Sequence, residues 1–553
     1  MPSPSATHEV LNQSPPFEDV NLFTSDRALT EAVTREGGGF AVDRLTAFGK
    51  ACGIAAALER GRLANEFPPK LKSFDSKGRR LDIVECHPAY HECMAMSVAE
   101  GLHCSASEQL VKPGSNSGAN VARSAGCYMA IQMEAGHQCP ITMTNAAVPA
   151  LLVQPDLAAA WLPKIFSREY DKSFQPAKAK RGVTIGMGMT EKQGGTDVRA
   201  NTTTAKPAGA GGPGAEYIIT GHKWFMSAPM CDAFLVLAQA PGGLSCFLMP
   251  RWLPDGTVNG LCFQRLKDKL GNRSNASSEV EFHEAHGWLV GEEGRGIATI
   301  IEMVTCTRLD CAVGSAGLMR LALANAIHHC RHRTVFERKL VDQPIMQQVL
   351  ADVALDVEAA TALSFRLCRS FDRADDPRAA AWRRLMTPVT KYWVCKLGPA
   401  VAYEAMECMG GNGYVEESIQ ARLYRELPLN AIWEGSGNVM ALDMLRVLQR
   451  EPEAIEIVLD ELRTTVGDDP RLKAQIDRIE TMLHEPRLLE QRGRALTEAL
   501  ATLGAGAILR AHAPAVVSDA FIATRLSGPP RKTYGQDLER VDTRAIVDRA
   551  LPG

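Results

Sequence analysis

The spacing of hydrophobic and polar residues divides the chain into regions. After a polar, proline-bearing start, apolar residues recur three and four positions apart through the first 180 residues, as they do in amphipathic helices. The stretches 42–60 and 151–165 are also rich in Ala and Leu, which favours helices that pack on one another. We therefore predict an N-terminal helical domain over residues 1–181.

The spacing changes over residues 182–292. Gly, Pro and Asn clusters separate short runs rich in β-forming residues at 182–189, 217–220, 233–239 and 245–250. No helical crossover lies between these runs, so they predict a central antiparallel β domain and not a doubly wound nucleotide-binding sheet. A Gly-x-Gly-x-x-Gly match at 209–214 lies in a Gly/Pro loop and does not change this prediction.

Helical spacing returns after residue 292. Long Ala-rich stretches at 304–326, 343–371 and 379–409 predict a helical bundle over residues 293–450. A further helical domain is predicted over residues 451–553, with helices at 455–462, 472–483 and 488–510 and a loop at 527–535.

Composition narrows the class of protein. The chain has 553 residues, of which 45% are apolar and 23% charged, as in a soluble protein of several domains. Its net charge of -3 indicates no general attraction to nucleic acid or anionic membranes. The fifteen cysteines include no Cys-x-x-Cys pair and are expected to be reduced thiols. Since no secretory signal and no long apolar run is present, we expect a cytoplasmic protein that is not anchored to a membrane.

One acidic residue, Glu434, stands among apolar and small neighbours. Ile432 and Trp433 precede it, and Gly-Ser-Gly-Asn (435–438) follows, so the carboxylate is predicted at a tight turn that a ligand can approach. Desolvation by Trp433 would raise the pKa of this carboxyl towards the working pH of a general base. The alternative is a structural acid that caps a helix starting near Val439.

Two stretches of the predicted β domain suit a flat, polar ring. Residues 187–197 combine the hydroxyls of Thr190 and Thr196 with paired glycines, and residues 221–227 place aromatic side chains beside Ser227. The alternatives are a Gly-rich turn and a buried aromatic strand.

Two histidine pairs have four-residue spacing. Pro88 favours a helix start at His87 and His91 over a metal site, and His328 and His332 have no carboxylate at the spacing of a metal site. We therefore predict no metal.

Five motifs occur in an order that resembles the acyl-CoA dehydrogenases. They are Thr-Glu-x-x-Gly-Gly-Thr-Asp (190–197), Gly-x-Lys-x-Phe-x-Ser (221–227), Arg333-x-x-Phe336, Gly-Gly-x-Gly-Tyr (410–414) and Trp-Glu-Gly-Ser (433–436). The versions at 187–195, 268–277 and 432–438 resemble the AidB-like branch, the bacterial alkylation-response flavoproteins.

The resemblance implies an α+β fold with an N-terminal helical domain, a central antiparallel β domain, a C-terminal four-helix bundle and an extra C-terminal helical domain. It also implies FAD as cofactor, an acyl-CoA thioester as substrate and a homotetramer. By position, the FAD-binding residues would be Met187, Met189, Thr190, Gly195, Thr196, Phe225, Met226, Ser227, Arg333, Phe336, Gly410, Gly411, Ile432, Trp433, Gly435, Ser436 and Asn438.

Among these, Arg333, Phe336, Gly410 and Gly411 would contact the FAD of a neighbouring subunit. The chain departs from the wider family close to them: Glu407 stands where many members have Gln, and Glu337 where many have Gly. A carboxylate near a pyrophosphate repels it unless it is paired. The sequence therefore does not decide which residues bind the adenine end of FAD beside Glu407 and Glu337.

The implied chemistry is α,β-dehydrogenation with slow turnover. Glu434 would take the α-proton, its backbone N–H would help polarise the thioester carbonyl, and Arg308 would orient it. Some relatives carry the base at the position that Thr307 fills, and Thr cannot serve as one.

The alternative function is that of a flavoprotein of the adaptive response to alkylation damage, which binds or protects double-stranded DNA through residues 451–553. The resemblance to the AidB-like branch implies this alternative. This segment has 14 Lys and Arg against 17 Asp and Glu, whereas a duplex requires a basic surface. The basic residues that would have to cluster are Arg446, Arg492, Arg494, Arg510, Arg531 and Lys532.

Overall fold

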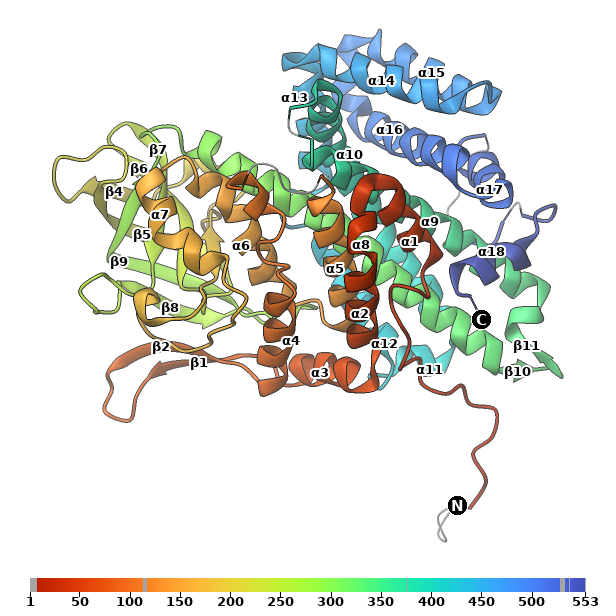
Figure 1. Cartoon of the computed structure of the whole chain (residues 1–553), viewed down its shortest axis with the longest axis horizontal. Helices are drawn as coiled ribbons and strands as arrows, with labels where there is room; N and C mark the ends of the chain where they lie inside the picture. The colour runs from red at the N-terminus through yellow and green to blue at the C-terminus, as the bar shows by residue number, and fades with distance from the viewer. Residues whose placement is uncertain (1–6, 113–116, 374, 528–532, 537, 553) are drawn as a thin grey trace.

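The structure is a computed structural model that describes residues 7–112, 117–373, 375–527, 533–536 and 538–552. Its N-terminal part is mostly helical, as predicted (Figure 1). The helices are α1 (Arg27–Val33), α2 (Val42–Gly53), α3 (Ala55–Glu66), α4 (Pro88–Ala99), α5 (Ala119–Met133), α6 (Gln138–Leu151) and α7 (Pro155–Ile165).

Three details of this part differ from the prediction. The predicted helix 42–60 is broken at Ile54, whose backbone is extended, because the chain around Val20 passes against Gly53 and leaves no room for a side chain there. The predicted helix 151–165 begins at Pro155, where proline suits the first helical position. A hairpin of β1 (Lys70–Phe74) and β2 (Arg80–Glu85) interrupts the helices.

The central part is a sheet that closes on itself. Its strands are β3 (Ile185–Gly188), β4 (Thr204–Pro207), β5 (Glu216–Ser227), β6 (Ala233–Ala240), β7 (Gly243–Pro250), β8 (Leu261–Leu266) and β9 (Ser277–Val290). Strand β5 pairs with β9, β9 with β7 and β7 with β6, and β3 and β4 connect β6 back to β5. The pairs are antiparallel as predicted, except that β3 and β4 run parallel to β6. Closure leaves few strand edges open to other chains.

Helices follow to the end of the chain. They are α8 (Gly296–His332), α9 (Pro344–Phe371), α10 (Pro377–Cys408), α11 (Gly411–Tyr414), α12 (Ile419–Glu426), α13 (Gly437–Arg450), α14 (Pro452–Val466), α15 (Pro470–Leu483), α16 (Leu489–His512), α17 (Ala515–Arg525) and α18 (Thr543–Ala550). A short hairpin, β10 (Thr334–Val335) and β11 (Arg338–Lys339), follows α8. All six predicted helical stretches of this region fall within observed helices, give or take a residue at their ends.

Helix α8 links the two large hydrophobic cores. Its first turns contribute Ile300 and Met303 to the core inside the sheet, and the rest of the helix lies in the helical core. That helical core continues from Leu22 to Leu551, so α14 to α18 are packed onto the bundle and not separate from it (Figure 1). Within the described residues no helix is both long and apolar enough to cross a membrane.

Candidate functional site

Glu434 lies in a loop that two buried cations hold by its backbone. Lys391 of α10 donates from Nζ to the carbonyl oxygen of Trp433 at 2.7 Å and also to that of Gly435. Arg308 of α8 donates from Nε to the carbonyl oxygen of Glu434 at 2.9 Å. Three successive carbonyls therefore point towards cations from the bundle. This arrangement holds Glu434 and Gly435 in the left-handed region, with φ of 58° and 106°.

Further contacts fix these cations and the loop. Arg308 also binds Asp443 of α13, at 2.6 Å between Nη1 and Oδ2. The indole of Trp433 donates to Oδ1 of Asn430 at 2.9 Å, and the Asn430 amide donates to Ser315 on α8. The loop is thus tied to α8, α10 and α13.

The carboxyl of Glu434 turns to α8 and does not cap α13. Thr307 donates from Oγ1 to Oε2 of Glu434 at 2.7 Å, whereas the residue at the cap position of α13 is Ser436. Burial raises the pKa of Glu434, and this effect outweighs the hydrogen bond from Thr307 and the positive charges of Arg308 and Lys391. A carboxyl with a raised pKa is suited to accept a proton near neutral pH.

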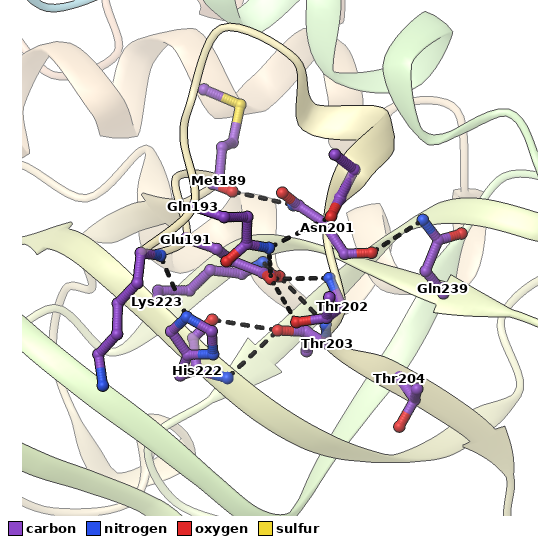
Figure 2. Close-up of polar contacts among 12 residues, drawn as sticks. Met189, Glu191, Gln193, Asn201, Thr202, Thr203, Thr204, His222, Lys223 and Gln239 are labelled. Carbon is purple, nitrogen blue, oxygen red and sulfur yellow. Dashed lines mark hydrogen bonds and ion pairs between the residues drawn. The ribbon is translucent and has the colours of Figure 1, made fainter.

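A buried ion pair supports the loop 189–196. Figure 2 shows that Oε1 of Glu191 accepts from Nζ of Lys223 at 2.8 Å, while Oε2 accepts from the backbone of Thr202 at 2.7 Å and from the side chain of Gln193. Burial acts to raise the pKa of Glu191, but Lys223 and these hydrogen bonds lower it to about 2. Glu191 therefore stays ionised and anchors the loop that carries Thr190, Gly195 and Thr196.

Strand pairing brings the two predicted flavin stretches together. Gly188 pairs with Met226, and the amide of Trp224 donates to the carbonyl of Thr190 at 2.8 Å. The side chains differ in access. Phe225 is 48% exposed, whereas Met226 is fully buried inside the sheet, so that only its backbone can meet a ligand. The half-buried side chains are Met187, Met189, Thr190 and Ser227, and the exposed residues are Gly195 and Thr196.

Two polar residues connect this surface with Glu434. Burial raises the pKa of Cys139 to about 12; hydrogen bonds with Asn275 and Ser227 oppose the increase and the charge of Glu434 adds to it, so the thiol lies near all three groups. Asn275, in the loop before β9, is fully buried, and its side-chain amide has no nitrogen or oxygen partner among the described residues. A buried amide that has only the Cys139 thiol beside it, next to exposed aromatic surface, fits a flat ring that carries both donors and acceptors.

The third group of predicted residues lies at the other end of α8. Thr307 and Arg333 are about 39 Å apart along the helix at 1.5 Å per residue, so Arg333 cannot reach a flavin bound beside Glu434 of its own chain. Phe336 is 89% exposed, and Gly410 and Gly411 are exposed as well. Glu337 has a φ of 61°, a backbone conformation that glycine adopts at little cost.

The families that match the chain cover it in three successive parts. The adaptive response protein AidB N-terminal domain matches residues 12–172, the acyl-CoA dehydrogenase middle domain 186–285, and the acyl-CoA dehydrogenase C-terminal domain 294–449. The chain is 48% identical to AidB of Escherichia coli strain K12 over 521 residues, which are 94% of each protein. The chain belongs to the acyl-CoA dehydrogenase family. Within it the chain is AidB-like, and FAD is the cofactor of this family.

Other proteins resemble the chain over most of its length. Family member 11 of Caenorhabditis elegans is 30% identical over 77% of this chain and 70% of that one. The crystal structure of Caenorhabditis elegans ACDH-11 in complex with C11-CoA has a TM-score of 0.86 and 24% identity over 98% of both chains. Bd2924 in its apo form has a TM-score of 0.83 and 26% identity over 91% of this chain and 99% of that one. The predicted acyl-CoA dehydrogenase fold is confirmed.

The sequence did not point to Lys391, Asp443 or Asn275. Lys391 stands in an apolar helical stretch, and a lysine in such surroundings is a signal of a buried role. Asp443 carries no signal of this kind, because only the fold brings it to Arg308. Asn275 lies in the AidB-like stretch 268–277, but only the fold shows that it lies at the flavin surface.

The histidine pairs have local partners. His87 caps α4, with Nδ1 accepting from the amide of Ala89, and His91 contacts the hydroxyl of Tyr170 at 2.9 Å. At the end of α8, Nε2 of His328 contacts the carbonyl of Pro15 at 2.9 Å and Nδ1 of His332 contacts the carbonyl of His328 at 2.8 Å.

The basic residues considered for a DNA surface are partly neutralised. Arg492 pairs with Glu485, and Arg510 lies 3.7 Å from Asp469. Arg446 is exposed, and Arg494 donates to the hydroxyl of Tyr392 at 3.1 Å. Arg531 and Lys532 lie outside the described residues.

Proposed function

We propose that the protein dehydrogenates an acyl-CoA thioester, with Glu434 as the base that removes the α-proton. FAD, when bound, supplies the acceptor for the β-hydride, so that a Cα=Cβ double bond is formed. The observation that carries the proposal is the carboxyl of Glu434, which is buried, has a raised pKa and is held on a left-handed backbone by Arg308 and Lys391.

The thioester carbonyl would bind at the amide of Glu434. This N–H donates to no acceptor among the described residues, while the three neighbouring carbonyls are turned towards Lys391 and Arg308. A free N–H held in a fixed direction stabilises the negative charge that develops on a carbonyl oxygen. Support for the substrate class comes from ACDH-11, whose structure contains C11-CoA.

The flavin would lie on the surface formed by β3, β5 and the loop before β9. Residues suited to hold it are Thr190, Phe225, Ser227 and Asn275, with Met226 contributing through its backbone. Met187, Met189, Gly195, Thr196 and the loop residues Ile432, Trp433, Gly435, Ser436 and Asn438 complete the proposed set. Trp433 packs against the core of the sheet and so closes the space between the two surfaces.

The adenine end of FAD would be held by a neighbouring subunit of a homotetramer. The distance along α8 supports this proposal, since Arg333 and Phe336 lie too far from Glu434 to serve the same cofactor. Phe336, Ile345 and Tyr414 are 89%, 82% and 79% exposed in the single chain, and such side chains are typical of protein interfaces.

Glu434→Gln tests the proposed base. The variant keeps the size and hydrogen-bonding capacity of the side chain but cannot take a proton. We therefore expect FAD content to be unchanged and the rate of flavin bleaching by acyl-CoA to fall roughly 10²- to 10⁴-fold. The measurement is anaerobic stopped-flow spectroscopy with acyl-CoAs of increasing chain length.

Glu302→Gln is the matched control, because Glu302 is an exposed acid on the same helix as Thr307. It should bleach at the wild-type rate. If Glu434→Gln reduces its flavin as fast as the wild-type protein does, Glu434 is a structural acid and the proposed role is wrong. A mobility-shift assay with duplex DNA on the same samples tests the alternative function, which should not depend on Glu434.

A further inference from the structure

Residues 12–18 form a strap that lies across the C-terminal end of α8. The Ser14 hydroxyl contacts Nδ1 of His329 at 3.0 Å, and the carbonyl of Pro15 contacts Nε2 of His328 at 2.9 Å. The ring of Phe17 lies 5.3 Å from the ring of His328. In Figure 1 the first described residues lie on the same side of the molecule as α11, β10 and β11. The strap is thus docked on α8 through several side chains.

Asn12 begins the strap and binds the backbone beyond α8. Its side chain donates from Nδ2 to the carbonyl of Thr334 at 2.7 Å, and its Oδ1 accepts from the amide of Thr334 at 2.8 Å. Its own carbonyl accepts from the guanidinium of Arg333 at 2.7 Å. Asn12 has a φ of 55°, which asparagine tolerates better than most residues. One residue therefore fixes both the backbone of Thr334 and the side chain of Arg333.

The hairpin that follows Arg333 is strained. Thr334 pairs with Lys339 and Val335 with Arg338, so that Phe336 and Glu337 form a two-residue turn. Their φ values are 51° and 61°, and a turn of this kind normally contains Asn and Gly. A bulky Phe and a Glu in the left-handed region persist only where surrounding contacts enforce them. The contacts of Asn12 with Thr334 are of this enforcing kind.

The strap also contacts the segment of Gly410 and Gly411, which is the second segment proposed to contact a neighbour's FAD. The side-chain amide of Asn412 donates to Oε1 of Gln13 at 3.0 Å. Asn412 directly follows Gly410 and Gly411, where φ at Gly410 is 60°. Consecutive strap residues, Asn12 and Gln13, thus hold the two segments that would contact a neighbour's FAD.

We propose that Asn12 is a positioning residue for the cofactor of the neighbouring subunit. It holds the hairpin 333–339 in the strained form that presents Arg333 and Phe336 outwards. The inference rests on the proposed function, in which Arg333 and Phe336 bind the adenine end of FAD. Arg333 keeps its remaining guanidinium N–H groups without an acceptor among the described residues, so they are free to bind an anion such as a pyrophosphate.

Asn12→Ala is the first test. The amide of Thr334 loses its acceptor, so its hydrogen exchange should become faster, while Ser14, Pro15 and Phe17 keep the strap on α8. Loss of the paired hydrogen bonds should raise the Kd of the apoprotein for FAD about tenfold. The readouts are exchange at residues 333–339 and quenching of FAD fluorescence. Leu11→Ala is the control, because Leu11 precedes Asn12 and is 67% exposed.

Glu337→Gly in the Asn12→Ala background is the second test. Glycine removes the cost of the left-handed turn, so the hairpin no longer needs Asn12 and the affinity for FAD should return to near the wild-type value. Glu284→Gly is the matched control, because Glu284 is an exposed residue of β9 with a φ of 49°. This substitution should not restore the affinity of the Asn12→Ala protein for FAD.

The outcomes separate this inference from the proposed function. Unchanged exchange at residues 333–339 in Asn12→Ala, or a loss of FAD affinity that Glu337→Gly does not restore, overturns the positioning role. If Arg333→Ala binds FAD like the wild-type protein, the proposed site of the adenine end is wrong instead. In that case the exchange measurement still tests whether Asn12 holds the hairpin.

Discussion

The hydroxyl of Thr307 donates a hydrogen bond to the carboxyl of Glu434, the proposed base. This bond stabilises the ionised carboxylate and so opposes the rise in pKa that burial causes. Thr307→Val should therefore raise the pKa of Glu434 further. Because only the ionised carboxylate accepts a proton, kcat/KM increases with pH through this pKa, and its acidic limb should move to higher pH in the variant.

The pH dependence of kcat/KM for acyl-CoA oxidation checks this prediction. Thr305→Val is the control: among the described residues the Thr305 hydroxyl bonds only the carbonyl of Ile301 in its own helix, so the variant should leave the profile in place. A profile that is the same in Thr307→Val and in the wild-type protein would show that Thr307 does not set the pKa of the base.

At the scale of elements, Glu134 joins the turn between α5 and α6 to the loop before β9. Its buried carboxylate accepts from the amides of Gly136 and His137 at 2.8 and 2.7 Å and from the hydroxyl of Ser274 at 2.6 Å. Burial acts to raise the pKa of Glu134, but His137, Ser274 and these amides outweigh it and lower the pKa to about 2. The ionised form is therefore the one that the fold stabilises.

Glu134→Gln should lower the free energy of unfolding by about 3 kcal/mol at pH 7. A folded-state pKa below the unfolded value of 4.5 stabilises the protein above pH 4.5, and this contribution is lost as the pH falls to about 2. The difference between variant and wild type should thus shrink between these pH values. Urea unfolding over this pH range measures it, with exposed Glu417→Gln as a variant that should show no difference at any pH.

The sequence predicts an element or a site residue where contacts between neighbours along the chain determine it. It fails where the contacts join residues that are far apart in sequence. The helices of the bundle and the runs around Thr190 and Ser227 follow from local spacing, and the structure has them. The break at Ile54 does not, since it arises where the distant Val20 passes Gly53. Arg308 was expected beside Glu434, but its partner Asp443 is 135 positions away and no local pattern relates them.

For the whole molecule, we predict a homotetramer whose assembly requires the exposed side chains at the far end of α8. Light scattering of the FAD-bound protein should give four times the mass of one chain. Phe336→Asp should dissociate the assembly and release FAD, because a carboxylate cannot be buried unpaired at an interface. Since Phe336 is 89% exposed in the single chain, the variant should still fold, as circular dichroism can verify. A wild-type monomer of 60.0 kDa that retains FAD contradicts the prediction.

The contact between Asn12 and Thr334 spans 322 positions of sequence, and that between Gln13 and Asn412 spans 399. The strap is synthesised before α8, the hairpin and α11, yet its docking site exists only after these elements have been synthesised and folded. Contacts between such distant segments form late, because the long loop between them must first be closed. Docking of the strap is therefore among the last steps of folding. In the proposed homotetramer, a subunit whose bundle is incomplete would have no finished hairpin to offer its neighbour, so the order of folding would keep unfinished chains out of the assembly.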